Sequence, residues 1–452
     1  MASTKPARGT RDFLPADIRK REYVVGIIKE VYERYGFEPL ETPAFENLET
    51  LTGKYGEEGN QLIFKILKRG EKFTAALSAD AKESDLADLA LRYDLTVPLA
   101  RVVANERERL PKFFKRYQIQ PVWRADRPAR GRFREFYQCD VDCIGSNSPV
   151  IEAELISAVK QVLSRLGFAD FIIRLNHREV LRGMLDAVGI ADDRHGDALI
   201  ALDKLDKIGS EGVLKEFAER GLIGGERLIA LFERLTDAGN MLILEILGDF
   251  IGDHAAGKQG LADLDRILSL AATPSVKIDA SLARGLSYYT GSIMEINVPD
   301  LSGSLGGGGR YDGLIGMFEK EQIPACGFSL GLERILVVME ERGMFPPKIV
   351  ESTPADVFVT IFSEETIADS LKLANELRGH GIRVTVYPQA DKEDKQWKYA
   401  NSIKVPWIFT VNSTDVAEGM VSFQNLATRE RFREPVDKAA VIVKEQLSAV
   451  SR

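Results

Sequence analysis

Two strand-like segments, residues 115–123 and 136–144, flank an arginine-rich loop in the first third of the chain. The pattern predicts an antiparallel hairpin, in which residues two apart face the same side of the sheet. Gln138, Asp140 and Asp142 therefore share one face. Two carboxylates and an amide suit an ammonium or imidazole ligand, whereas the arginines of the loop suit phosphates. The alternative is a solvated hairpin that carries ordinary surface charges.

The sequence around this hairpin predicts an α+β fold, an antiparallel sheet flanked by helices. Residues 16–35 carry apolar side chains at helical spacing, and residues 149–166 form a second predicted helix. From residue 181 to 265, leucine and isoleucine recur at helical intervals with charges between them. This stretch predicts a helical insertion that interrupts the sheet domain.

The last quarter of the chain has a different pattern, which begins with the glycine and prolines of a linker at 341–354. Beyond it, β-rich runs alternate with helical stretches, an order typical of a parallel α/β unit of about 100 residues. The β-rich runs are 355–362, 383–387 and 407–411, and the helical stretches are 365–378 and 394–403. The expected domains are residues 1–180 with 266–340, the insertion 181–265, the linker 341–354 and the C-terminal domain 355–452.

Composition limits the kinds of site to consider. Cys139, Cys143 and Cys326 form neither an even disulfide framework nor a paired metal spacing, which favours a reducing cytoplasm. The four histidines are scattered, so no metal site is expected. No apolar run approaches the roughly 18 residues of a membrane helix, so no membrane association is expected. The net charge of −8 argues against a protein coated by nucleic acid, but the basic segment 112–134 leaves local phosphate contact open.

A second candidate site surrounds Arg284, which lies in a run of small and aromatic residues, 279–291. A guanidinium in such surroundings needs an anion, because an unpaired buried charge is costly. The glycine-rich run 303–309 is expected to form a loop where backbone approaches a ligand closely. Residues 327–334 predict a strand that turns into a helix and delivers Arg334. Two arginines and a glycine strip indicate a nucleotide or another phosphate-bearing substrate.

These segments together resemble the histidyl-tRNA synthetases, a family of class II aminoacyl-tRNA synthetases in subclass IIa. The resemblance runs nearly end to end, and its motifs occur in the family's order: residues 91–96, Arg124 with 131–142, 284–289 and 327–334. It implies a six-stranded antiparallel catalytic sheet, an obligate homodimer, a helical insertion and a C-terminal anticodon-binding domain. The long helix and the strand that ends at Pro43 match the family's first motif, which lies at the dimer interface.

The resemblance also implies roles for individual residues. Arg124 and Arg334 would be catalytic cations that clamp the ATP phosphates together with Arg132, and Arg284 would be a third catalytic cation at the α-phosphate. The residues implied in histidine binding are Asp94, Leu95, Thr96, Gln138, Asp142, Tyr288, Tyr289 and Tyr311. On the residues alone, Asp94 and Thr96 ahead of Pro98 could equally form a turn cap.

The implied reaction is activation of L-histidine by ATP and Mg²⁺ to histidyl-adenylate, followed by transfer to the 3′ end of tRNA(His) in the cytoplasm. Helix 394–400 could contact the anticodon or be a plain amphipathic helix. One alternative is a catalytically silent paralogue that senses histidine as a regulatory subunit. Such paralogues usually lack the C-terminal domain and the motif arginines, which this chain keeps. Another is a synthetase for glycine, proline or threonine, although the 284–289 signature belongs to the histidine enzymes. Ser287 departs from the aspartate that the family often has.

Overall fold

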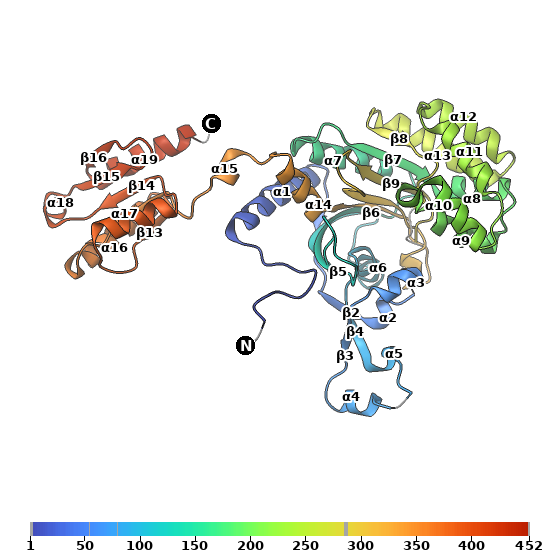
Figure 1. Cartoon of the computed structure of the whole chain (residues 1–452), viewed down its shortest axis with the longest axis horizontal. Helices are drawn as coiled ribbons and strands as arrows, with labels where there is room; N and C mark the ends of the chain where they lie inside the picture. The colour runs from blue at the N-terminus through green and yellow to red at the C-terminus, as the bar shows by residue number, and fades with distance from the viewer. Residues whose placement is uncertain (1–2, 54, 79, 284–287, 451–452) are drawn as a thin grey trace. The chain divides into compact units, whose positions relative to one another are not determined.

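The structure, a computed structural model, describes residues 3–53, 55–78, 80–283 and 288–450 (Figure 1). It divides into two compact units, Met1–Met344 and Phe345–Arg452. The division lies within the glycine- and proline-containing stretch 341–354. Among the described residues, no helix is both long enough and apolar enough to span a lipid bilayer.

The first unit is built on an eight-stranded sheet with the order β1-β5-β6-β11-β10-β9-β7-β8. The strands are β1 (Glu38–Pro39), β5 (Phe114–Trp123), β6 (Glu135–Ile144), β7 (Ile172–His177), β8 (Val276–Ile278), β9 (Ser292–Asn297), β10 (Gly306–Arg310) and β11 (Ala325–Gly331). The six strands from β5 to β7 in this order are all antiparallel to their neighbours, whereas the short strands β1 and β8 add a parallel partner at each edge. The predicted α+β class and the predicted hairpin are therefore confirmed, and the six antiparallel strands gain two parallel ones.

Helices α1 (Pro15–Arg34), α7 (Val150–Arg165) and α14 (Leu332–Glu341) pack on one face of this sheet (Figure 1). The inward side of α1 buries Val24, Ile28 and Val31, which recur at helical spacing. The helices predicted at 16–35 and 149–166 are confirmed to within one residue at each end. Because these helices take up the apolar side of β6, the alternate residues of that strand face the other side.

The glycine-rich run is a strand and not a loop between Gly306 and Gly309. It lies between β9 and β11, and both neighbours approach it closely. A Cβ atom on Gly308 would lie 2.1 Å from the backbone oxygen of Gly327. The prediction of a loop over these residues is wrong, because the glycines serve close packing of backbone against backbone inside the sheet.

A small three-stranded sheet with the order β2-β4-β3 precedes the hairpin. Its strands are β2 (Phe45–Asn47), β3 (Lys65–Leu67) and β4 (Ala87–Leu91), and the short helices α2 (Leu48–Leu51), α3 (Gly56–Gln61), α4 (Glu71–Ala76) and α5 (Glu83–Leu86) connect them. Helix α6 (Thr96–Asn105) follows directly after β4. This arrangement holds the segment 92–96 at the end of β4, where α6 begins.

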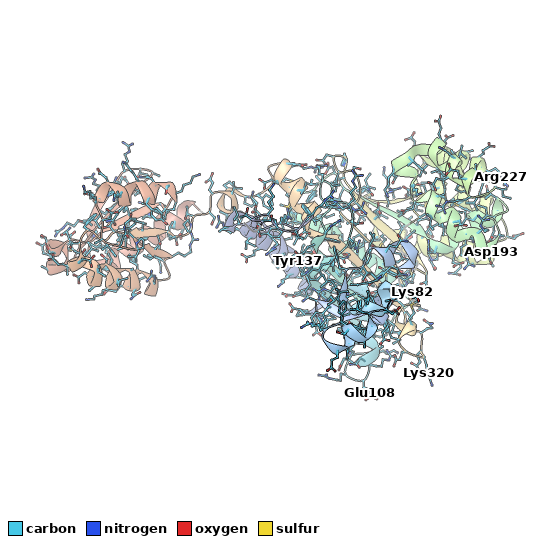
Figure 2. The ribbon with its side chains drawn as sticks, turned by 60° about the horizontal axis from the view of Figure 1, so that its bottom comes forward. Lys82, Glu108, Tyr137, Asp193, Arg227 and Lys320 are labelled. Atoms are coloured by element: carbon cyan, nitrogen blue, oxygen red, sulfur yellow. The ribbon has the colours of Figure 1, made fainter. Side chains whose placement is uncertain are left out.

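Helices fill the chain between β7 and β8, which are themselves parallel neighbours. They are α8 (Arg178–Ala187), α9 (His195–Leu202), α10 (Leu205–Glu219), α11 (Gly225–Leu235), α12 (Asn240–Ile251) and α13 (Ala255–Ala271), with the 3₁₀ turn η1 (Asp192–Arg194). The helical stretch thus starts at Arg178 and ends at Ala271. Charged side chains such as Asp193 and Arg227 point outward from these helices (Figure 2).

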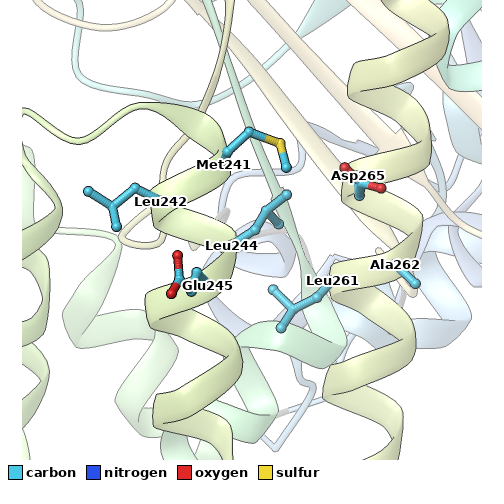
Figure 3. A pocket seen from close by; sticks show the side chains of 7 residues that line it. All are labelled: Met241, Leu242, Leu244, Glu245, Leu261, Ala262 and Asp265. Atoms are coloured by element: carbon cyan, nitrogen blue, oxygen red, sulfur yellow. The ribbon is translucent and has the colours of Figure 1, made fainter.

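A shallow groove runs between α12 and α13 (Figure 3). Apolar side chains such as Met241 and Leu261 line it together with the carboxylates of Glu245 and Asp265. None of the residues that the sequence singles out as site residues lines this groove.

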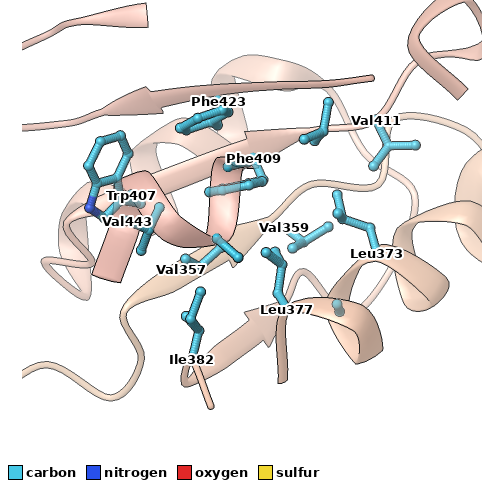
Figure 4. Packing of buried hydrophobic residues seen from close by; sticks show 14 residues of the cluster. Val357, Val359, Leu373, Leu377, Ile382, Trp407, Phe409, Val411, Phe423 and Val443 are labelled. Atoms are coloured by element: carbon cyan, nitrogen blue, oxygen red, sulfur yellow. The ribbon is translucent and has the colours of Figure 1, made fainter. Parts of the chain in front are cut away.

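The second unit contains a five-stranded sheet with the order β13-β12-β14-β15-β16. The strands are β12 (Val357–Val359), β13 (Val384–Val386), β14 (Trp407–Thr410), β15 (Val421–Asn425) and β16 (Arg431–Glu434). The helices are α15 (Pro347–Val350), α16 (Ile367–Gly379), α17 (Glu393–Ser402), α18 (Ser413–Glu418) and α19 (Val436–Val450), with the turn η3 (Glu364–Thr366). Apolar side chains cover both faces of the sheet, with Val357 and Phe409 on one side (Figure 4) and Phe358 and Ile408 on the other.

The three strands that the sequence predicts in this unit are confirmed as parallel, and two further strands that it does not predict complete the sheet. Strands β13, β12 and β14 are parallel, but β15 and β16 run antiparallel to their neighbours. The chain between Thr410 and Val421 is too short for a crossover to a parallel strand, which takes a dozen residues or more. It forms the short helix α18 and turns back at Gly419, whose φ is +67°.

Candidate active site

A ladder of polar side chains crosses the open face of the first sheet. Three residues of β5 lie directly opposite three of β6: Arg116 opposite Asp142, Gln118 opposite Asp140, and Gln120 opposite Gln138. The predicted shared face of Gln138, Asp140 and Asp142 is confirmed. Asp140 and Asp142 are each only 2% exposed, so the alternative of a solvated hairpin is excluded.

Asp142 is held by partners on both carboxylate oxygens. Its Oδ2 lies 2.8 Å from a terminal nitrogen of Arg116, and its Oδ1 accepts a hydrogen bond from the Tyr311 hydroxyl. Gly327 of β11 lies beside it, where a Cβ atom would come within 1.8 Å of Oδ1. Burial raises the pKa of Asp142, while Arg116 and the Tyr311 hydrogen bond act in the opposite direction. The glycine therefore makes room for this carboxylate, and the arginine offsets part of the cost of its burial.

Asp140 and Gln138 continue the ladder with fewer partners. Burial raises the pKa of Asp140 to about 7; the nearby Asp142 raises it further, and Arg116, 3.8 Å away, lowers it. The amide nitrogen of Gln138 donates to the Ser329 hydroxyl over 2.8 Å. Within the described residues, three buried oxygens of the ladder have no hydrogen-bond partner: Gln138 Oε1, Asp140 Oδ1 and Asp142 Oδ2. A buried oxygen of this kind is a binding position for a donor on a ligand.

Asp94 joins the ladder to the start of α6. Its Oδ1 accepts hydrogen bonds from the backbone nitrogens of Thr96 at 3.2 Å and Val97 at 3.0 Å, so it does cap the turn. The same oxygen accepts from the Tyr55 hydroxyl at 3.0 Å, and Oδ2 accepts from the Tyr288 hydroxyl at 3.5 Å. Burial raises the pKa of Asp94. The cap and the site are thus the same group, and the backbone oxygen of Leu95 meanwhile accepts from Arg116.

Three tyrosines form an aromatic wall between these carboxylates. The ring centroid of Tyr288 lies 4.9 Å from that of Tyr289 and 6.1 Å from that of Tyr311. Because Tyr288 contacts Asp94 and Tyr311 contacts Asp142, the wall joins the two acids. The structure therefore brings together the predicted residues at 94–96, 138, 142, 288, 289 and 311.

The predicted phosphate-binding arginines have defined positions, except Arg284. Arg124 donates to the Tyr93 backbone oxygen over 3.0 Å, and its guanidinium lies 4.3 Å from the centre of the Tyr93 ring. Arg334 donates to the backbone oxygen of Ser304 over 2.5 Å and lies against the loop at Gly131. Arg132 forms a two-bond ion pair with Asp126 at 2.8 and 3.0 Å. Arg284 and Ser287 lie outside the described residues.

Three residues of the site were not anticipated: Tyr55, Arg116 and Gln118. Arg116 and Gln118 lie two apart on β5, so the alternation that identified the acids of β6 could have identified their partners as well. Tyr55 comes from an irregular segment between α2 and α3, and no sequence pattern indicates that it reaches Asp94.

The histidines are less scattered than the sequence indicates. His195 Nε2 lies 3.2 Å from one oxygen of Asp186, and His254 Nε2 lies 2.9 Å from the other. Asp192 adds a second carboxylate, and the possible ligand atoms of Asp186, Asp192 and His195 all lie within 4.8 Å of one another. Helices α8, α9 and α13 bring these residues together, away from the polar ladder. The expectation of scattered histidines is wrong for this pair.

The side chains of the polar ladder are suited to binding a ligand, and the nearby cysteines are not suited to act as nucleophiles. Burial raises the pKa of the thiols of Cys139, Cys143 and Cys326, to about 11 for Cys143, so they stay protonated and are poor nucleophiles. Buried carboxylates with aromatic walls suit a compact donor-rich ligand, and the arginines beside the loop suit phosphates.

Comparison with known proteins gives the same picture. Residues 9–335 match the family model described as histidyl-tRNA synthetase, and residues 356–446 match an anticodon binding domain. The chain is 39% identical to the histidine--tRNA ligase of Cytophaga hutchinsonii over 95% of its length and 97% of that protein. It is 41% identical to that of Bacteroides fragilis over 94% of this chain and 95% of that protein.

Solved structures are similar in fold as well. The histidyl-tRNA synthetase of Nostoc sp. superimposes with a TM-score of 0.79 at 28% identity, covering 99% of this chain and all of that one. An ATP phosphoribosyltransferase regulatory subunit/histidyl-tRNA synthetase of Bacillus halodurans superimposes with a TM-score of 0.71 at 23% identity, covering 89% of this chain and 98% of that one, which shows a likeness of fold alone.

Proposed function

The chain belongs to the histidyl-tRNA synthetase family, and from that premise we propose that it activates L-histidine with ATP and transfers the histidyl group to tRNA(His). The observation that supports this proposal most directly is the buried Asp142, which contacts Arg116 and Tyr311 and packs against Gly327. A fixed carboxylate beside an aromatic wall is the partner that an imidazole N–H needs. The reaction class is that of an aminoacyl-tRNA ligase.

Histidine would lie across the polar ladder. Asp94 and Thr96 hold its ammonium group at the start of α6, and Gln138 and Asp142 receive the imidazole. The rings of Tyr288, Tyr289 and Tyr311 would enclose the imidazole. Leu95, whose backbone oxygen accepts a hydrogen bond from Arg116, would lie at the base of the site. A site that hydrogen-bonds its substrate discriminates strongly against analogues that lack those groups, since its own buried polar atoms then stay unpaired.

ATP would bind beside the second-motif loop, where Arg124 and Arg334 lie, and Arg284 would be the third cation that acts on its phosphates. The histidine carboxylate oxygen attacks the α-phosphorus, the bond to the bridging oxygen breaks, and pyrophosphate leaves. Fixed guanidiniums stabilise the charge that accumulates on the phosphate oxygens. Arg132 can reach a phosphate only by leaving Asp126, which makes it the weakest ATP contact of the four.

Magnesium enters as part of the ATP substrate. The ion prefers phosphate oxygens and water with one or two carboxylates, and it needs no cage made wholly of protein. Among the described side chains, the carboxylates beside these loop arginines already form ion pairs, Asp126 with Arg132 and Glu341 with Arg130. The residues present therefore fit Mg²⁺ carried on the nucleotide.

In the second step a hydroxyl of the terminal ribose of tRNA attacks the carbonyl carbon of the adenylate, its proton is lost to a phosphate oxygen, and AMP leaves. We place this reaction in the cytoplasm, in a homodimer joined through the region of α1. Helix α17 would contribute to anticodon binding through Lys395, Lys398 and the 46%-exposed Tyr399, because aromatic and cationic groups suit unstacked bases. Trp397 packs into the apolar core of that unit.

The test is ATP–pyrophosphate exchange with each of the twenty amino acids offered separately. Histidine alone should stimulate exchange, and failure to do so would refute the proposal. Arg284→Ala should lower exchange about 100- to 1,000-fold while the melting temperature is unchanged, since the cation acts on charge that develops in the transition state. Arg182→Ala, on the half-exposed surface of α8, is the matched control and should keep full exchange. Equal exchange in the two variants contradicts the role of Arg284.

A further inference from the structure

Arg116 is fully buried beside two carboxylates of the site, Asp140 and Asp142. It lies 2.8 Å from Asp142 and 3.8 Å from Asp140, and Asp94 lies close enough to raise the pKa of both of those acids. Its own side chain is 0% exposed. The Arg116 guanidinium therefore lies beside Asp142 and Asp140, while the cation that acts on Asp94 is Arg124.

The position of Arg116 is fixed by neutral groups as well. It donates to Gln118 Oε1 over 3.1 Å and to the Leu95 backbone oxygen over 3.3 Å. Gln118 is in turn anchored by hydrogen bonds to Thr42 at 2.9 Å and to Gln120 at 2.6 Å. The guanidinium cannot swing away from the acids without breaking this network, so its geometry is preset before substrate arrives.

Asp142 and Asp140, the two acids of β6, differ in their contacts with neighbouring side chains. Asp142 forms an ion pair with Arg116 through Oδ2 and accepts a hydrogen bond from the Tyr311 hydroxyl through Oδ1. Asp140 has a hydrogen bond with Ser329, and its Oδ2 lies 3.8 Å from Arg116, 1 Å farther than the 2.8 Å between Arg116 and Asp142. Asp142 is the positioned acceptor of the pair.

Resting on the proposed function, we propose that Arg116 is a positioning residue for histidine recognition, which holds Asp142 ready to accept the imidazole N–H and keeps the nearby Asp140 from displacing it as the charged acid. Arg116 does not touch the substrate in this assignment. It selects which of two adjacent carboxylates does.

The titration behaviour of the pair is consistent with this role. Burial raises the pKa of both acids, and Arg116 lowers both. The groups that face Asp142 are Arg116 from β5, Tyr311 from the segment after β10, Asp94 from the start of α6, and Asp140 on its own strand. Loss of Arg116 would remove the cation that lowers the pKa of Asp142, so that pKa would rise further and the carboxylate would lose its capacity as an acceptor over a wider range of pH.

The experiment measures the KM for histidine and kcat in pyrophosphate exchange from pH 6.5 to 9. Arg116→Met should raise KM about 10- to 100-fold, the range for a lost charged hydrogen bond, with kcat changed little. The ratio of variant to wild-type KM should fall as pH rises, because Asp142 ionises again at higher pH. The ratio removes the titration of histidine itself, which is the same for both enzymes.

Two further variants separate positioning from a merely structural role. Arg116→Lys should recover part of the loss, because it restores the charge. Asp140→Asn added to Arg116→Met should lower KM again by about 3- to 10-fold, because it removes the like charge beside Asp142. Arg101→Met, which breaks the Arg101–Glu46 ion pair on α6, is the control and should leave KM unchanged.

A KM ratio that is flat with pH, or a double variant no better than Arg116→Met, overturns the inference. If Arg116→Met does not fold, Asp140→Asn alone decides: it should move the acid limb of the wild-type KM profile to lower pH, and an unmoved limb contradicts the inference. Absence of histidine-dependent exchange in the wild-type protein would instead contradict the proposed function.

Discussion

The two sheets of this protein bury opposite kinds of side chain. The open face of the first sheet buries Arg116, Asp140 and Asp142, with glycine strands beside them. The second sheet covers both of its faces with apolar groups such as Trp407 and Phe358. The first face pays in stability for a preset binding site, whereas the second gains stability from ordinary apolar packing.

This difference separates the two kinds of mutational effect. Changes of the polar side chains on the first sheet should alter substrate binding while stability stays level or improves, whereas a side chain added to its glycine strand should lower stability. Changes in the second core should lower stability while the activation of histidine stays level. The four predictions below test that separation, in order of decreasing effect.

Gly308→Ala should have the largest effect, a loss of at least about 4 kcal/mol in the stability of the first unit. The added Cβ would meet the Gly327 oxygen at 2.1 Å and the Phe328 Cα at 2.7 Å, and paired backbone cannot move aside. Gly248→Ala in α12 is the control, since its Cβ meets only Leu261 at 3.8 Å and alanine favours the helix. Calorimetry should show the loss in the first unit alone, and equal melting of the two variants would contradict the close-packing argument.

Phe409→Ala should destabilise the second unit by about 3–4 kcal/mol, because it removes a fully buried ring that stacks on Phe423 at 4.7 Å. Histidine-dependent exchange should stay within about twofold, while aminoacylation of tRNA falls with the folded fraction of this unit. Val416→Ala, at a 43%-exposed position, serves as the control. A parallel loss of exchange would break the proposed separation of the units.

Asp142→Asn should lower kcat/KM for histidine about 100-fold, or ~2.7 kcal/mol, since the amide is neutral and can turn its donor side to the imidazole. Stability should be unchanged or slightly higher, because one of two adjacent buried acids is removed. Steady-state exchange and thermal melting on the same sample check both parts. A variant that loses activity and stability in proportion would show that Asp142 is a structural residue.

The smallest effect concerns pH. Burial raises the pKa of Asp140 to about 7, so the folded first unit binds an extra proton between about pH 4 and 7, and this stabilisation is lost as pH rises through 7. Asp140→Asn should therefore make the first unit about 1–2 kcal/mol more stable than wild type at pH 8 and level at pH 4. In the second unit burial tends to raise the pKa of Asp415, but hydrogen bonds from Arg433, Ser422 and Asn412 lower it overall, so stability there is lost as pH falls. Denaturation curves from pH 4 to 8 test both slopes, and a variant that tracks wild type at every pH refutes the first.

Local sequence patterns predicted the helices and strands whose side chains recur at a regular helical or strand spacing. The helices at 16–35 and 149–166 and the hairpin strands follow from spacing that is fixed within a few residues of chain. The glycine strand and the antiparallel edge of the second sheet did not follow, because both depend on which strands lie alongside. A run of glycines has no side-chain period from which a strand could be predicted.

Part of the site was predictable for the same reason. The alternation along β6 identified Gln138, Asp140 and Asp142, and the resemblance to a known family supplied Asp94 and the tyrosines. Tyr55 and the meeting of His195 with His254 were not predictable, since each joins segments far apart in sequence. Arg284 remains a prediction from sequence.

The sequence by itself determined the polar face, since successive side chains of a strand must point to opposite sides whatever surrounds them. The sequence also determined the family, through the residues of its motifs and the order in which they occur. Only the tertiary structure decided three contacts of Asp142. Arg116 lies opposite it on β5, the Tyr311 hydroxyl donates to its Oδ1, and Gly327 leaves space for its carboxylate. The physical reason is that register across strands is set by long-range pairing and burial, which no local stretch of sequence specifies.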